Sequence, residues 1–195
     1  MEPIEIQCLA KLYPNKRYEV AQFIIEQFND LFSGICKDKE KLISLFEQAL
    51  VVEQCFVAID KNRIIGLITI SNSKRSSVVI SRQKVQQILG WIRGWMFYLN
   101  VMKGPLVLKP NDIYISTLAV HKGYRRKGIA TQLLNYVMNE SPRNQYLLEV
   151  IDVNEGAIKL YESLGFKVFK RSKQRFAKQA GFNERLYMKK NGQLI

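Results

Sequence analysis

The sequence has few of the residues that build metal sites and disulfide frameworks. It contains one histidine and three cysteines among 195 residues. The cysteines, Cys8, Cys36 and Cys55, are widely spaced and form neither a CxxC pair nor a cluster with histidine, so neither a zinc site nor a disulfide framework is predicted. Unpaired thiols are typical of a reducing compartment, and we expect a cytoplasmic protein that binds no metal.

Long apolar runs are also missing. No stretch of about 18 uninterrupted apolar residues occurs, and the N-terminus lacks the basic start and apolar core of a signal peptide. We therefore expect neither secretion nor a membrane-spanning segment. Hydrophobic residues make up 47% of the chain and charged residues 24%, values that suit one folded domain with an adequate core.

Acidic residues are scarce relative to basic ones, which gives a formal net charge of +13. The excess is uneven, because residues 101–195 carry 17 cations against 7 acids. Such a field favours anionic partners, whether nucleic acid, a membrane surface or a phosphorylated small molecule. Charge alone does not choose among these classes.

The order of predicted elements is that of a mixed α/β protein. Hydrophobic patterns predict helices near residues 16–32, 37–50, 129–138 and 154–166, and strands near 4–10, 55–60, 63–71, 111–120, 144–151, 167–176 and 183–190. The strand, helix, strand order from 111 to 151 requires a parallel pair with a right-handed crossover. The last two strands are predicted to close the sheet as an antiparallel hairpin.

An aromatic stretch at about 84–103 precedes that crossover unit. It is interrupted by Arg93, is too short to span a bilayer, and contains Trp91, Trp95, Phe97 and Tyr98. A helix packed on the sheet is the plainest interpretation. A substrate-pocket wall, a dimer seam and a membrane-surface helix stay open as alternatives.

The segment HKGYRRKGIATQLL, His121 to Leu134, places cations and two glycines between a strand and an amphipathic helix. The start of a helix has free N–H groups and partial positive charge, and glycine lets a phosphate approach the backbone closely. The pattern is neither the Walker loop nor the G-x-G-x-x-G fingerprint. A basic surface turn is the plainer alternative to a pyrophosphate site.

The context of this loop favours the phosphate site. From Asp112 to Phe166 the chain resembles the GNAT superfamily of N-acetyltransferases, with R-x-x-G-x-A at 125–130 and N-x-x-A-x-x-L-Y-x-x-x-G-F at 154–166. The second block, together with Leu148 to Val150, is similar to ribosomal-protein alanine acetyltransferases. The resemblance implies a single N-acetyltransferase domain over 1–195, with core motifs at 112–166 and the aromatic helical insert at about 84–103.

The resemblance also implies the fold and the cofactor. The expected fold is α/β (α+β), with a central twisted, mostly antiparallel sheet, one parallel strand pair splayed for the cofactor, and helices on both faces. The expected cofactor is acetyl-coenzyme A, with contacts from Leu118, Ala119, Val120, Arg125, Arg126, Lys127, Gly128, Ile129, Ala130, Thr131, Asn154 and Tyr161. Ala130 stands where many members have glycine, a substitution that the family's pattern allows.

Acetyl transfer to an amine needs a base for the amine and a proton for the departing thiolate, and the resemblance assigns these roles to Glu149 and Tyr161. Glu149 interrupts the apolar strand YLLEVI, where burial would suit a base; pairing with a cation would make it structural instead. Tyr161 is expected to keep its proton at pH 7 and donate it toward sulfur, unless it is only a core residue. His121 is expected to be a solvated loop residue.

We expect direct transfer to a primary amine, either a protein N-terminus or a small amine, in a ternary complex. Two alternatives stay open: a basic module for nucleic acid or the ribosome, and a non-catalytic acetyl-coenzyme A sensor. No RRM, KH or zinc-finger signature supports nucleic acid as a partner. The six cations of KVFKRSKQRFAKQ, at 167–179, fit a solvated face or a site for the 3′-phosphate, an acidic substrate or RNA. A homodimer is favoured if Trp91 or Trp95 is exposed.

Overall fold

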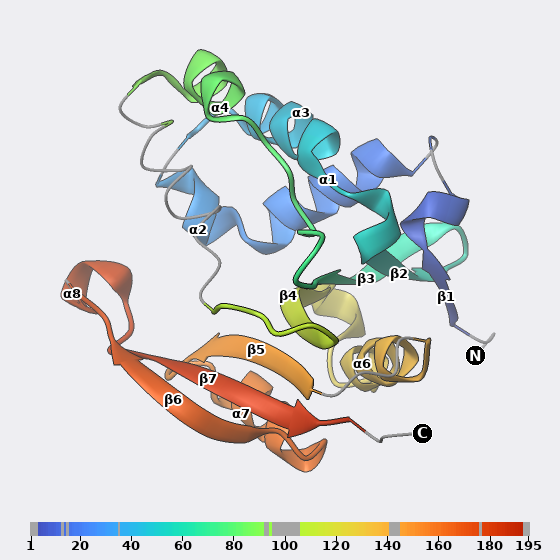
Figure 1. Ribbon diagram of the computed structural model, residues 1–195. Coiled ribbons are helices and arrows are strands. Elements are labelled where there is room, and N and C mark those ends of the chain that lie inside the picture. The colour runs from blue at the N-terminus through green and yellow to red at the C-terminus, as the bar shows by residue number, and fades with distance from the viewer. Residues whose placement is uncertain are drawn as a thin grey trace.

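One seven-stranded sheet organises the molecule (Figure 1). The structure is a computed structural model, and it describes residues 4–12, 14, 16–34, 36–91, 94, 106–140, 145–175 and 177–192. In sheet order the strands are β1 (Glu5–Cys8), β2 (Cys55–Asp60), β3 (Arg63–Ser71), β4 (Asp112–Val120), β5 (Gln145–Ile151), β7 (Glu184–Asn191) and β6 (Lys167–Lys173). The pair β4 and β5 is parallel, and the other neighbours are antiparallel. The mixed, mostly antiparallel sheet is confirmed.

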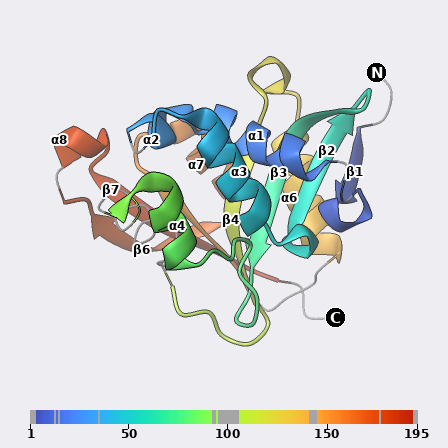
Figure 2. The ribbon, with the colours of Figure 1, turned by 90° about the horizontal axis from the view of Figure 1, so that it is seen from above.

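Helices cover both faces of this sheet, as the sequence predicted. The α-helices are α1 (Arg17–Gln27), α2 (Asn29–Ser33), α3 (Lys39–Ala49), α4 (Arg82–Leu89), α6 (Ile129–Glu140), α7 (Glu155–Ser163) and α8 (Ala177–Ala180), and short 3-10 turns are η1 (Leu9–Lys11), η2 (Val52–Gln54) and η3 (Lys122–Tyr124). One apolar cluster joins α1, α3 and α4 to the sheet, and a second joins α6 and α7 to its other face (Figure 2).

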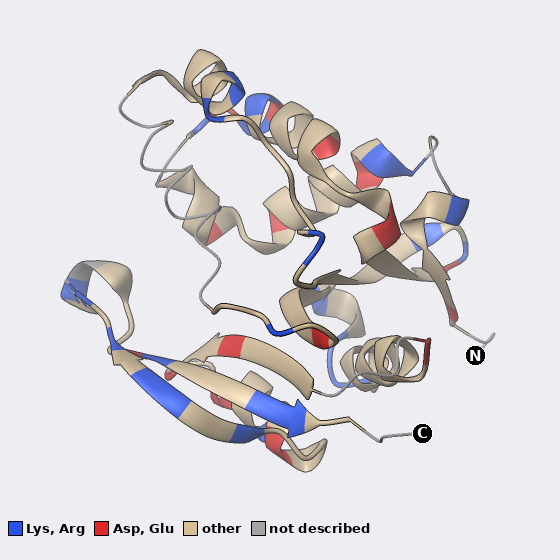
Figure 3. Ribbon diagram, viewed as in Figure 1, with Lys and Arg blue, Asp and Glu red and all other residues tan. Residues whose placement is uncertain are grey.

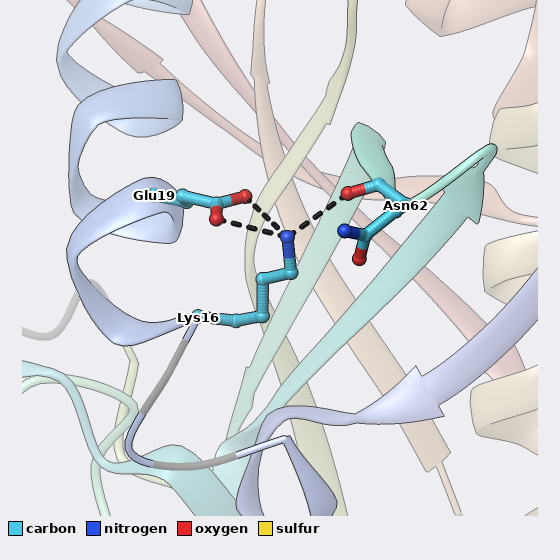
Figure 4. Close-up of polar contacts among 3 residues, drawn as sticks. All are labelled: Lys16, Glu19 and Asn62. Carbon is cyan, nitrogen blue, oxygen red and sulfur yellow. Dashed lines mark hydrogen bonds and ion pairs between the residues drawn. The ribbon is translucent and has the colours of Figure 1, made fainter.

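The first helix is fastened to the turn between β2 and β3. The Nζ of Lys16 donates to both carboxylate oxygens of Glu19 (2.8 and 2.9 Å) and to the carbonyl of Asn62 (2.9 Å) (Figure 4). Lys61 and Asn62 have positive φ angles of 47° and 64°, the backbone of a two-residue hairpin turn. The two strands predicted near 55–60 and 63–71 are therefore joined by a tight turn.

Two predicted helices differ from the structure. The pattern over 16–32 forms two helices, because the chain turns at Phe28 between α1 and α2. The helix predicted at about 84–103 begins earlier, at Arg82, where the Ser81 hydroxyl accepts from the N–H of Lys84 (3.2 Å). It ends at Leu89, and Gly90 follows with a φ of 81°. Beyond it, Trp91 is 75% exposed. Trp95, Phe97 and Tyr98 lie outside the described residues.

Candidate active site

The parallel strands β4 and β5 separate halfway along their length. They pair only from Asp112–Ile115 to Gln145–Leu148, whereas β4 continues to Val120 and β5 to Ile151. Their outer neighbours stay paired to the strand ends, with Gly66 opposite Val120 and Arg185 opposite Ile151. The sheet therefore splits between β4 and β5, and the predicted splayed pair is present.

The backbone of β4 presents hydrogen-bonding groups to this split. The N–H of His121 donates to the carbonyl of Ile65 on β3 (2.9 Å). Because backbone groups of successive strand residues point to opposite edges, the N–H groups of Leu118 and Val120 face β5. The carbonyl of Val120 also faces this side, since it accepts from the Nε of Arg125 (3.2 Å). An extended ligand chain could pair with this edge.

A β-bulge precedes the open edge. Thr69 pairs with Thr117 and Ile70 with Ile115, so Ser116 is the extra residue on β4. The side chains of Ile115 and Leu118 consequently both pack toward the core under α6 and α7, although they are three residues apart. Ala119 packs into the opposite core, under α1 and α3.

The loop after β4 forms an anion cradle at the start of α6. Arg126 and Gly128 have positive φ angles of 60° and 77°, and the first helical bond runs from Gln132 N–H to the Gly128 carbonyl (3.0 Å). Within the described parts of the chain, the N–H groups from Arg126 to Thr131 have no acceptor. Convergent free N–H groups at a helix start bind phosphate, and the exposed side chains of Arg125 and Lys127 add positive charge. This loop fits a coenzyme A pyrophosphate.

Contacts behind this loop hold it in place. The hydroxyl of Tyr124 donates to Asp60 (2.8 Å), and the ammonium group of Lys127 lies 5.0 Å from the Tyr124 ring centroid. His121 is more than a solvated residue, because its Nδ1 accepts from the N–H of Gly123 (3.2 Å) and its Nε2 lies 3.2 Å from Arg63. Its role in the structure is to cap η3.

Glu149 lies on the sheet face away from α6 and α7. Its β5 neighbours Leu148 and Val150 pack under those helices, so alternation turns Glu149 to the other side. Its carboxylate forms an ion pair with Arg185 of β7, and only 16% of the side chain is exposed. Directly across the ladder is Tyr187. The carboxylate is thus both largely buried and ion-paired. The burial that would suit a base and the pairing that would suit a structural residue are both present.

Tyr161 comes from α7 and reaches the same neighbourhood from the other face. Burial raises the pKa of its hydroxyl to about 12, and its ring packs edge-on against Phe166 (5.8 Å between centroids). Burial also raises the pKa of Tyr114 on β4, and Glu149, Tyr187 and Tyr161 raise it further. Glu149, Tyr187 and Tyr161 therefore each lie within electrostatic range of Tyr114, at the level where β4 and β5 part.

Asn154 has a structural task of its own. Its side-chain oxygen accepts from the N–H of Ala157 (3.3 Å) and caps the start of α7. The cap fixes the helix that carries Tyr161. A contact from Asn154 to the cofactor stays a prediction, as do the other predicted cofactor contacts.

Sequence reasoning missed three residues of this site, Tyr114, Arg185 and Tyr187. Each lies on a strand that was predicted. Tyr114 is near Glu149 because β4 pairs with β5, whereas Arg185 and Tyr187 are near it because β7, not β6, is the neighbour of β5. Alternation in ERLYMKK would have placed Arg185 and Tyr187 on one face, without saying which residues faced them.

Comparison with known proteins identifies the class. Residues 71–166 match the acetyltransferase (GNAT) family. The N-alpha-acetyltransferase 30 of Schizosaccharomyces pombe is 31% identical over 153 residues, which cover 75% of this chain and 81% of that protein. An N-acetyltransferase from Staphylococcus aureus has a similar structure, with a TM-score of 0.65 and 19% identity over 95% of this chain and all of that one.

A shorter stretch is similar to vertebrate proteins. The N-alpha-acetyltransferase 30 of Xenopus laevis is 48% identical over 56 residues, which cover 27% of this chain but only 20% of that protein's length. The fold and its split sheet are those of an acetyltransferase. The chain belongs to the GNAT family of acetyltransferases.

Proposed function

We propose that the protein transfers an acetyl group from acetyl-coenzyme A to the α-amine of a polypeptide N-terminus. The observation that carries the proposal is the open edge of β4, which begins where β4 and β5 part, near Tyr161 and Glu149, and ends before the N–H groups around Gly128. The relatives named N-alpha-acetyltransferase 30 support an N-terminal acceptor. Family membership disfavours a nucleic-acid module as the primary role.

The chain's residues divide the binding task by position. The N–H groups from Arg126 to Thr131, with the side chains of Arg125, Arg126 and Lys127, hold the diphosphate. The N–H groups of Leu118 and Val120 hold the pantetheine arm and polarise the carbonyl at its end. Acetyl-coenzyme A supplies the acetyl group as a thioester, and these contacts orient it toward the face of Glu149.

Glu149 is the proposed base for the incoming amine. About 10 to 20% of an α-amine with a pKa near 7.8 is neutral at pH 7, against about 1 in 2,500 for a lysine side chain. An α-amine therefore needs less help from a base than a lysine side chain does, which favours the α-amine as the acceptor. A water chain that ends at Glu149 would perform the same task.

Tyr161 is the proposed donor to the departing sulfur. Since burial raises the pKa of its hydroxyl to about 12, it keeps its proton throughout the physiological range. A thiol has a pKa of about 8.5, so a thiolate would not retain the tyrosine proton at equilibrium. The hydroxyl therefore stabilises the thiolate by donating a hydrogen bond.

We further propose a single domain and a cytoplasmic location. Both apolar clusters pack on the same sheet, which supports one domain. Cys8, Cys36 and Cys55 are free thiols, which supports a reducing compartment. Among the described residues, no helix is long and apolar enough to cross a membrane.

Calorimetry and a turnover assay test the proposal together. Acetyl-coenzyme A should bind at micromolar concentration, and release of free thiol should be faster with unblocked N-terminal peptides than with matched peptides whose only amine is a lysine side chain. No binding would contradict the phosphate site. Equal or faster turnover on the lysine peptides would contradict the N-terminal acceptor.

A further inference from the structure

The open face of the β6–β7 hairpin carries lysines that continue outward from the active site. Register pairs Lys167 with Lys189 and Lys170 with Tyr187, and directly opposed residues share a sheet face. Tyr187 in turn lies opposite Glu149. We call Lys167, Lys170 and Lys189 the hairpin lysine face; it lies on the same side of the sheet as the proposed base.

No carboxylate in the described part of the chain neutralises this face. From Lys167 to Lys190 the sequence has nine Lys and Arg residues and one acid, Glu184 (Figure 3). Glu184 pairs with Arg171 (3.1 Å) and lies opposite Lys173, on the other face of the hairpin. Glu149 is already paired with Arg185. The three lysines therefore project uncompensated positive charge.

Two aromatic rings hold these ammonium groups in place. The Nζ of Lys170 lies 5.1 Å from the ring centroid of Tyr187, and the Nζ of Lys189 lies 5.6 Å from that of Phe169. Rings covered by a cation have less surface for stacking with nucleic-acid bases, the contact on which single-strand binding depends. The arrangement favours carboxylates over nucleic acid as ligands.

The position of the face separates it from the proposed diphosphate cradle. Lys189 lies opposite Leu147, near the start of β5. Because β4 and β5 run parallel and the phosphate loop follows the end of β4, the hairpin lysine face lies toward the opposite end of the sheet. Lys170 lies two strands from Glu149, about 10 Å away, a span of about three residues of extended chain.

We propose that the hairpin lysine face binds acidic residues of the acceptor polypeptide, beginning about three residues after its N-terminal residue. The identity of the ligand as an acceptor rests on the proposed function, whereas the preference for acidic peptide does not. The hairpin lysine face would then select among polypeptides by the acidic residues that follow the N-terminal residue. The site around Glu149 would bind only the reacting amine.

Fluorescence anisotropy with two labelled ten-residue peptides tests this proposal. One peptide has glutamate at positions 4 to 7, and the other has glutamine there. The wild type should bind the acidic peptide at least about fivefold more tightly at 50 mM salt, and the advantage should shrink at 500 mM. The double variant K170Q/K189Q should lose the advantage. The matched control K173Q/K190Q removes the same charge from the other face of the same strands and should keep it.

Three results would overturn the proposal: no preference for the acidic peptide, equal losses in both double variants, or tighter binding of a twelve-nucleotide RNA that K170Q/K189Q abolishes. Turnover on the glutamine peptide separates the two proposals. If no amine is acetylated but the charge preference follows K170Q/K189Q, the proposed function fails and the binding face stands. If turnover is normal without any charge preference, only the binding face fails.

Discussion

Glu149 and Arg185 form an ion pair across the β5–β7 ladder, on the sheet face away from α6 and α7 and beside Tyr187. Only 16% of the Glu149 side chain and 39% of the Arg185 side chain are exposed. The carboxylate proposed as the base is thus held in one orientation by a fixed cation. Losing either partner would leave the other half-enclosed and unpaired.

Replacing Glu149 by glutamine should lower kcat/KM at pH 7 by roughly a hundredfold, the usual scale of a positioned base. The deficit should narrow toward pH 9, because an α-amine with a pKa near 7.8 becomes neutral by itself there. Glu184→Gln is the matched control, since Glu184 pairs with Arg171 on the other face of the hairpin. Initial rates across this pH range give the comparison, and a deficit of constant size would show that Glu149 acts only in the structure.

The variant Tyr161→Phe should reduce kcat by about tenfold or more while the affinity for acetyl-coenzyme A changes by less than about twofold. The ring and its packing against Phe166 are kept, and only the hydroxyl is lost. As a control, Tyr146→Phe removes the hydroxyl that donates to the Met138 carbonyl (3.0 Å), and it should cost about 1 kcal/mol of stability with kcat unchanged. An unaltered kcat in Tyr161→Phe would remove this tyrosine from the reaction.

Gly128→Ala should weaken acetyl-coenzyme A binding about tenfold and lower the free energy of unfolding by about 1 to 2 kcal/mol. A Cβ there would meet only the Nε2 of Gln132, at 4.0 Å, which is an ordinary contact, but the φ of 77° is strained for any L-residue with a side chain. Gly34→Ala, at a glycine with open space and a φ of −68°, should change neither quantity appreciably. Calorimetry and thermal melts would decide, and equal effects of the two changes would contradict the strain argument.

Alkaline pH should destabilise the protein through Tyr161. Its pKa is raised from 10.0 to about 12 by burial, so the stability that it contributes is complete below pH 10 and is lost as pH rises through 12. Two pKa units correspond to roughly 3 kcal/mol. Urea melts from pH 8 to pH 11.5 should show a smaller decline in Tyr161→Phe than in the wild type. Parallel declines would indicate that this hydroxyl becomes accessible to solvent.

Local patterns were enough to predict the elements that build the site. The stripe Ile129, Leu133 and Val137 predicted α6, and these side chains are at most 1% exposed in the core. The apolar strand YLLEVI, which Glu149 interrupts, predicted β5, and strand alternation puts Glu149 on the face opposite to Leu148 and Val150. Periodicity works here because both elements bury one side against the same core.

The order of the strands in the sheet could not be predicted from such local patterns. The sequence indicated a closing hairpin, but hairpin periodicity is the same whichever of its strands adjoins β5, so the partnership of Arg185 with Glu149 could not be predicted. The turn at Phe28 was missed for a related reason, because apolar spacing continues through it while the helix does not.

The β-bulge at Ser116 sets the sheet face and the strand edge to which each later residue of β4 points. Flattening the bulge while keeping Ser116 in regular alternation would rotate Leu118 and Val120 by half a turn, so that their side chains would leave the core under α6 and their N–H groups would point at β3. The backbone groups of Thr117 and Ala119 would then face β5 instead. The bulge at Ser116 therefore determines which backbone groups of β4 border the split between β4 and β5.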